Sequence, residues 1–263
     1  MIGIFDSGVG GLTVVKEIQK RLPGYQIIYF GDTARLPYGT KGAGFVQKYS
    51  SKIVNWLLDN GAKIIIIACH TSSAWASENL KRHFKNAPIF EMIAPAIKEA
   101  LKRTKNKKIG IIGTPGTVKS QAYERGLLSI DSGLEVYPVA CPLFVPLVEE
   151  GWISKKITKE IAEEYLKPLK KKKIDTLVLA CTHYPLLKKT IRRVLGPEVK
   201  IINPAESLAE ELSIYLAAHP ETALQIKKGN DHRFFFSDAP YNLKKISQIC
   251  FNQEIVVRIE DPF

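Results

Sequence analysis

The sequence has few cysteines, no long apolar run and a deficit of acidic residues, and each shortage excludes a class of protein. Four cysteines in 263 residues form no Cys-x-x-Cys pair, so a dithiol redox turn and zinc-ligand spacing are both missing, and we expect no metal. The longest apolar run, Ile64 to Ala68, is far too short to span a membrane. No basic, apolar leader precedes the first strand-like residues, so we expect a cytoplasmic protein with reduced thiols.

The acidic deficit gives a net charge of +12, from 38 basic and 26 acidic residues. The lysines concentrate at 101–108 and 167–175, where they are typical of solvated helix ends. Nucleic-acid binding would call for interleaved aromatic residues or a known motif, and neither is present, so we expect no nucleic-acid partner. A basic surface can instead attract a small anionic substrate.

Strand-like and helix-like segments alternate along the chain, and 45% of the residues are hydrophobic, as in a globular protein with a real core. Strands are expected at 1–5, 26–30, 63–68, 88–92, 108–112, 134–139, 175–180, 199–202, 234–238 and 254–259. Helices are expected at 12–22, 43–59, 72–84, 94–104, 154–171, 186–195 and 240–250. This order predicts an α/β fold with parallel sheets.

The sequence pattern also indicates two related halves. Each begins with a strand that enters a Gly-rich turn, "DSGVGG" at 6–11 and "GTPGTVKS" at 113–120. Neither turn fits a nucleotide-binding fingerprint. Two interpretations stay open: tight strand-to-helix turns without a ligand, or backbone N–H groups at helix starts that hold a carboxylate. We expect one domain from 1–94 with 207–263, a second from 95–206, and an active site between them.

A thiol, a hydroxyl and an imidazole follow each of two buried strands. "ACHT" (68–71) and "ACTH" (180–183) place Cys69 and Cys181 at strand ends, where parallel sheets bind ligands. A following helix N-terminus would lower the pKa of such a thiol. Carboxylates expected at the same edge are Asp6 and Asp32 at strand ends, and Glu149 in a loop. Cys141 and Cys250 are expected in the core.

Two thiols on different halves leave three chemical interpretations open. A redox pair usually lies within one short turn, which this spacing does not provide. A single nucleophile with His183 as its base leaves the other thiol without a role. Two proton-transfer groups on opposite faces of one α-carbon use both thiols and the symmetry of the halves.

The sequence resembles the cofactor-independent glutamate racemases over nearly its whole length. The segments that carry the resemblance are "FDSGVGGLT" (5–13), "GDTARLPYG" (31–39), "ACHTSSA" (68–74), "CPLFVPLVEEG" (141–151) and "CTHYPLL" (181–187). The resemblance implies interconversion of L- and D-glutamate without pyridoxal phosphate or another cofactor, for peptidoglycan synthesis. It also implies that each chain folds into two pseudo-symmetric, doubly wound α/β domains with parallel sheets, and that two chains form a homodimer.

By position, the resemblance implies that Cys69 and Cys181 transfer the protons, Cys69 acting on D-glutamate and Cys181 on L-glutamate. Asp6 and His183 would assist them, with Asp32 and Glu149 as further supports. The implied substrate contacts are Asp6, Ser7, Tyr38, Gly39, His70, Thr71, Thr114, Thr117, Thr182 and His183.

One position departs from the family pattern, because His70 stands where the family carries Asn after the first cysteine. A protonated His70 would favour a thiolate at Cys69 yet repel a substrate ammonium, whereas a ring turned away would do neither. The substitution leaves two other functions open, a racemase of aspartate or of a broader set of amino acids, and a binding protein that has lost catalysis.

Overall fold

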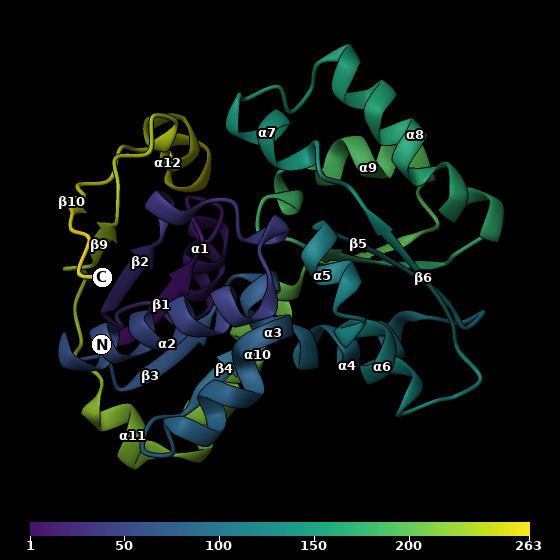
Figure 1. Cartoon of the computed structure of the whole chain (residues 1–263). Helices are drawn as coiled ribbons and strands as arrows, with labels where there is room; N and C mark the ends of the chain where they lie inside the picture. The colour runs from purple at the N-terminus through teal and green to yellow at the C-terminus, as the bar shows by residue number, and fades with distance from the viewer.

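The computed structural model describes residues 1–263, which form two lobes, each built around an all-parallel sheet (Figure 1). The first sheet has six strands in the order β10-β9-β2-β1-β3-β4, and the second has four in the order β6-β5-β7-β8. The strands are β1 Ile2–Asp6, β2 Ile27–Gly31, β3 Ile64–Ile67, β4 Ile89–Glu91, β5 Lys108–Gly113, β6 Glu135–Ala140, β7 Thr176–Ala180, β8 Lys200–Ile202, β9 Arg233–Phe236 and β10 Arg258–Ile259. The expected α/β fold with parallel sheets is therefore confirmed.

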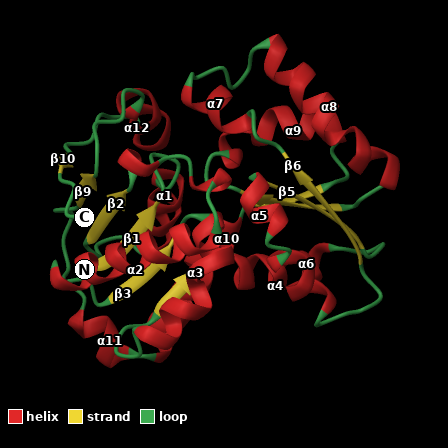
Figure 2. Ribbon diagram, in the orientation of Figure 1, coloured by secondary structure: helices red, strands yellow, loops and turns green.

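Helices cover both faces of each sheet (Figure 2). The α-helices are α1 Leu12–Arg21, α2 Ala43–Asp59, α3 His70–His83, α4 Ile93–Arg103, α5 Pro115–Lys119, α6 Ala122–Leu128, α7 Phe144–Glu149, α8 Lys156–Lys172, α9 Lys188–Leu195, α10 Pro204–Ala218, α11 Pro220–Gln225 and α12 Leu243–Phe251. Short 3₁₀ turns lie at Thr33–Arg35, Tyr38–Thr40 and Tyr184–Leu187. None of the helices is both long and apolar enough to cross a bilayer.

The two sheets repeat one topology. In the first sheet β2 lies on one side of β1, and β3 and then β4 lie on its other side. In the second sheet β6, β5, β7 and β8 are arranged in the same order. In such sheets the crevice at the switch point, beyond the strand carboxyl ends, is where ligands bind. Cys69 follows β3 and Cys181 follows β7, so the two thiols occupy equivalent switch points.

The strands are buried on both faces because successive side chains point to opposite sides of a sheet. Ile64 and Ile66 of β3 pack with α1 residues in the largest core cluster, whereas Ile65 and Ile67 pack against α2 on the other face. This explains why the strand sequences are continuous apolar runs rather than alternating ones. Cys141 and Cys250 are buried in that largest cluster, as expected.

The C-terminal segment returns to the first lobe, where β9 pairs with β2. Figure 1 shows this return as the yellow segment beside the purple strands, with both chain ends in one lobe. We therefore keep as a proposal the division into 1–94 with 207–263 and 95–206.

The structure differs from the sequence expectations at several elements. The strand expected at 254–259 is reduced to Arg258–Ile259, and the loop expected around Glu149 is the short helix α7. Helix α10 was not expected, because apolar residues such as Ile214 lie on its exposed side as well as on its buried face and leave only a weak amphipathic pattern. Asn203 caps it by accepting a hydrogen bond from the Ala205 N–H, with Pro204 at its first position.

Candidate active site

Cys69 follows β3 and is the N-cap of α3, so its position is fixed by the backbone on both sides. Its Sγ accepts a hydrogen bond from the Ser72 N–H at 3.4 Å and lies 3.8 Å from the Ser7 hydroxyl. Burial, with the carboxylate of Asp6 as the second cause, raises the pKa of Cys69 to about 11. The Ser72 N–H at the start of α3 lowers the pKa of Cys69, as expected, but burial outweighs this effect, so Cys69 carries its proton.

Asp6 ends β1 and connects the two halves. Its Oδ2 accepts hydrogen bonds from the N–H groups of Gly8 at 3.1 Å and Gly11 at 3.0 Å. Its Oδ1 accepts from the Thr182 hydroxyl, on the opposite half, at 3.5 Å. Burial raises the pKa of Asp6, while the positive charge of His183 and the backbone N–H groups oppose that rise. Asp6 thus lies between the Cys69 side and the Cys181 side of the crevice.

Cys181 follows β7 and faces a histidine–carboxylate pair. Its Sγ lies 3.9 Å from Nδ1 of His183, and Nε2 of His183 lies 2.9 Å from Oε1 of Glu149. Burial alone would lower the pKa of His183, but hydrogen bonds with Cys181 and Glu149 outweigh it and raise the pKa to about 10. His183 is therefore an imidazolium at neutral pH. Glu149, the last residue of α7, is its counter-ion.

Three predicted threonines converge from both halves. The Thr71 hydroxyl, on the first turn of α3, lies 3.0 Å from the Thr114 hydroxyl and 3.3 Å from that of Thr117. Thr114 is the N-cap of α5 and accepts from the Thr117 N–H at 3.2 Å. Gly39 packs directly on this group, since a Cβ there would lie 2.8 Å from Thr114. Hydroxyls at two helix starts form a group suited to a carboxylate.

His70 is turned away from the thiol beside it in the sequence. Its Nδ1 lies 2.8 Å from the hydroxyl of Tyr123, on α6 of the opposite half. Burial lowers the pKa of His70 to about 3, so the ring is neutral at physiological pH. The alternative in which a His70 cation acts on Cys69 is therefore wrong, and the alternative of a ring turned away is the one observed.

Asp32 contacts neither thiol, and its role as a further support stays a prediction. Its carboxylate is fully buried and accepts hydrogen bonds from Arg35 at 2.7 Å, Tyr38 at 2.6 Å and Ser237 at 2.8 Å. Tyr38 packs in one small cluster with Cys69. Any influence of Asp32 on the thiol therefore passes through the position of Tyr38.

Sequence reasoning missed three residues at the crevice, Gly10, Thr13 and Tyr123. A Cβ at Gly10 would lie 2.4 Å from the His183 ring, so only glycine allows the two halves to approach there. The Thr13 hydroxyl donates to the Thr182 carbonyl across the halves at 2.8 Å. The glycines of "DSGVGG" were a usable signal for close approach, whereas nothing in the sequence pointed to Tyr123.

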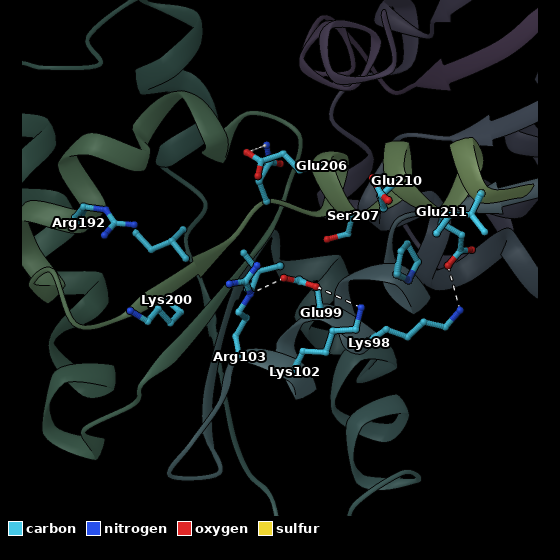
Figure 3. Close-up of a pocket in the computed structure, with 15 residues that line it drawn as sticks. Lys98, Glu99, Lys102, Arg103, Arg192, Lys200, Glu206, Ser207, Glu210 and Glu211 are labelled. Carbon is cyan, nitrogen blue, oxygen red and sulfur yellow. Dashed lines mark hydrogen bonds and ion pairs between the residues drawn. The ribbon is translucent and has the colours of Figure 1, made fainter. Parts of the chain in front are cut away.

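A pocket of about 680 Å³ lies elsewhere, between α4, β8 and α10 (Figure 3). Figure 3 shows that much of its charge is paired within the lining: Arg103 with Glu99 at 2.6 Å and Lys98 with Glu211 at 3.1 Å. It contains no thiol and no histidine. We therefore place the candidate active site at the cysteines, each of which is only 5% exposed.

Comparison with known proteins gives a consistent result. The family model described as Asp/Glu/Hydantoin racemase matches residues 9–212. Glutamate racemase from Aquifex pyrophilus is 45% identical over 260 residues, which cover 99% of this chain and 97% of that protein.

Two solved structures extend the likeness to the fold. A glutamate racemase isoform from Bacillus anthracis has a TM-score of 0.92 and 37% identity, covering 100% of this chain and 97% of its own. Glutamate racemase from Francisella tularensis, solved in complex with D-glutamate, has a TM-score of 0.89 and 35% identity, covering 98% and 96%.

Proposed function

The chain belongs to the glutamate racemases of the Asp/Glu/hydantoin racemase family, and from this premise we propose that Cys69 and Cys181 are its two proton-transfer groups. The enzyme is an isomerase that interconverts L- and D-glutamate, and the family role of that reaction is to supply D-glutamate for peptidoglycan. The observation that supports the two thiols best is their equivalence, because each follows the corresponding strand of a repeated topology.

In the proposed reaction one thiolate removes the α-proton and the opposite thiol supplies a proton to the other face. The electron pair of the broken C–H bond remains on the substrate as a carbanion until the second sulfur donates its proton. Each sulfur ends in the protonation state that the other began with. The reverse reaction therefore starts from the form that the forward reaction leaves.

The surroundings of the two sulfurs suit one direction of this scheme. Cys69 is a neutral thiol beside Asp6, whereas Cys181 faces the imidazolium of His183, which can donate to a thiolate. We therefore propose that this closed form is ready for L-glutamate, with Cys181 as the base and Cys69 as the acid. D-glutamate needs the opposite protonation states.

We further propose that the threonine group holds a substrate carboxylate. Thr71, Thr114 and Thr117 supply hydroxyls at the start of α3 and α5, where backbone N–H groups favour negative charge. A carboxylate held by such donors withdraws charge from the α-carbon as the proton leaves. Ser7, Tyr38, Gly39 and Thr182 complete the proposed contacts, and separation of the halves admits the substrate.

The test follows deuterium from solvent into glutamate. In deuterated water, early product from either enantiomer should carry deuterium at Cα, and recovered substrate should carry little, because the abstracting thiol returns its own proton. Cys69→Ala and Cys181→Ala should each abolish racemisation. Cys250→Ala is the matched control, since that thiol is equally buried, at 4% exposure, but lies in the core. Near wild-type racemisation by either active-site variant would overturn the proposal.

Specificity, assembly and location are proposals of the same standing. We propose that glutamate is preferred over aspartate, that the enzyme is a homodimer, and that it works in the cytoplasm, where its thiols stay reduced. Racemisation of an amino-acid panel, light scattering after gel filtration, and cell fractionation measure these three properties.

A further inference from the structure

Tyr123 and His70 form a buried contact between the two halves that the proposed reaction does not use. The phenol oxygen of Tyr123 lies 2.8 Å from Nδ1 of His70, and the two rings stack with their centroids 6.1 Å apart. Tyr123 is 3% exposed and His70 is 2% exposed. The charge that Cys181 can carry is among the causes, after burial and Glu91, that raise the pKa of Tyr123. His70 directly follows Cys69 in the chain, so the pair is close to the first thiol.

The hydrogen-bond partners of the pair determine which nitrogen of His70 carries the hydrogen. The Tyr123 hydroxyl makes only this one hydrogen bond in the protein. If Nδ1 donated to it, the phenol proton would be buried without an acceptor, which is costly. The phenol therefore donates to Nδ1, and the neutral ring carries its hydrogen on Nε2.

Nε2 of His70 makes no hydrogen bond within the protein, yet it is not among the fully enclosed polar atoms without a partner, which are on Gln26, Ser50, Ser72 and Trp75. It therefore retains access to open space, although the side chain as a whole is buried. His70 is flanked in the chain by Cys69 and Thr71, both of which line the crevice. A neutral N–H donor in this place suits a carboxylate oxygen and not an ammonium group.

We propose that Tyr123 is a positioning residue that fixes His70 in the Nε2–H form, so that His70 donates a hydrogen bond to a carboxylate of glutamate. The proposal rests on the proposed function for the identity of the ligand. It gives this chain a donor where the family's Asn offers both a donor and an acceptor. Because Tyr123 and His70 lie on opposite halves, the hydrogen bond that positions this donor forms only when the two halves are in contact.

The first experiment detects the hydrogen position directly and does not depend on activity. Nitrogen-15 NMR of histidine-labelled protein should show Nε2 of His70 protonated and Nδ1 unprotonated, with no titration between pH 6 and 8. In Tyr123→Phe the two forms should mix, because Nδ1 loses its donor. Addition of D-glutamate should shift the Nε2–H resonance. An Nδ1–H form in the wild-type protein would overturn the proposal.

The second experiment separates positioning from general stability. Tyr123→Phe should raise KM for glutamate about five- to tenfold with a smaller change in kcat, the loss expected for one hydrogen bond. In a His70→Asn background the same change should alter KM less than about twofold, because the ring it positions is gone. Tyr165→Phe is the matched control, since it removes a single-partner phenol of the same half and should leave KM unchanged.

Equal effects of Tyr123→Phe in the wild-type and His70→Asn backgrounds would reduce Tyr123 to a packing residue and overturn the proposal. A wild-type protein that does not racemise glutamate would overturn the proposed function and the identity of the ligand. The NMR result would then still decide whether Tyr123 fixes the ring. The two failures are therefore distinguishable.

Discussion

Replacing Glu149 by Gln tests the electrostatics of the site, because it removes one charge and preserves the shape. Glu149 is the counter-ion of His183, at 2.9 Å from Nε2, and the amide oxygen of Gln can still accept that hydrogen bond. What is lost is the charge that helps to raise the pKa of His183 to about 10 against the effect of burial. Glu149→Gln should therefore lower the pKa of His183.

The magnitude follows from the kind of bond that is weakened. A hydrogen bond to a charged group contributes about 1.5–3 kcal/mol, which corresponds to a loss of about 10- to 100-fold in kcat/KM. The same free energy corresponds to a fall of about one to two pKa units. His183 is needed as an imidazolium, which is present below its pKa. The high-pH limb of the kcat/KM profile should therefore move to lower pH in the variant.

A thermodynamic constraint sharpens the assay. Because L- and D-glutamate have equal free energies, the equilibrium constant is unity and kcat/KM must fall by the same factor in both directions. The separate kcat and KM values are free to differ, and the larger change in kcat is expected for L-glutamate, where Cys181 is the proposed base. Circular dichroism of the glutamate solution, followed from each enantiomer across pH 6–10, measures these quantities.

Glu150→Gln is the matched control for this prediction. The neighbouring carboxylate is exposed, accepts a hydrogen bond from Tyr241 at 2.7 Å, and does not contact His183. It should leave kcat/KM and its pH dependence nearly unchanged. A Glu149→Gln enzyme within twofold of the wild type at every pH, or an equal loss in Glu150→Gln, would refute the reasoning.

Three further predictions concern packing, titration and stability. Gly10→Ala should lower kcat/KM about 100-fold, because its Cβ would lie 2.4 Å from His183. Gly44→Ala is the control and should retain activity, because the space around Gly44 on α2 is open. Equal steady-state kcat/KM values for the two variants would contradict this. His70→Asn should leave the shape of the pH profile between pH 6 and 9 unchanged, because His70, with a pKa of about 3, is already neutral there; a displaced limb would contradict it. The raised pKa of His183 stabilises the fold fully below about pH 6.5, and this contribution is lost as pH rises through about 10, so Tm should fall from pH 7 to pH 10 by less in Glu149→Gln than in the wild type.

The sequence alone determined the class of fold and the places of the two thiols. Apolar runs such as Ile64 to Ile67 form buried parallel strands because their residue types and length suit no other environment, and a cysteine directly after such a run must lie at the ligand-binding edge. The repeated strand–cysteine pattern also indicated two related halves. These are local properties, carried by residues adjacent in the chain.

Only the tertiary structure decided the chemical state of each group, because charge and hydrogen bonding depend on residues far apart in sequence. The helix start at Cys69 favoured a low pKa, but burial beside Asp6 outweighs it. His70 and His183 follow similar strands, yet one is kept neutral by burial and the other is made cationic by its contacts with Cys181 and Glu149. Tyr123 packs in the core of its own half, but its one hydrogen-bond partner, His70, lies on the opposite half.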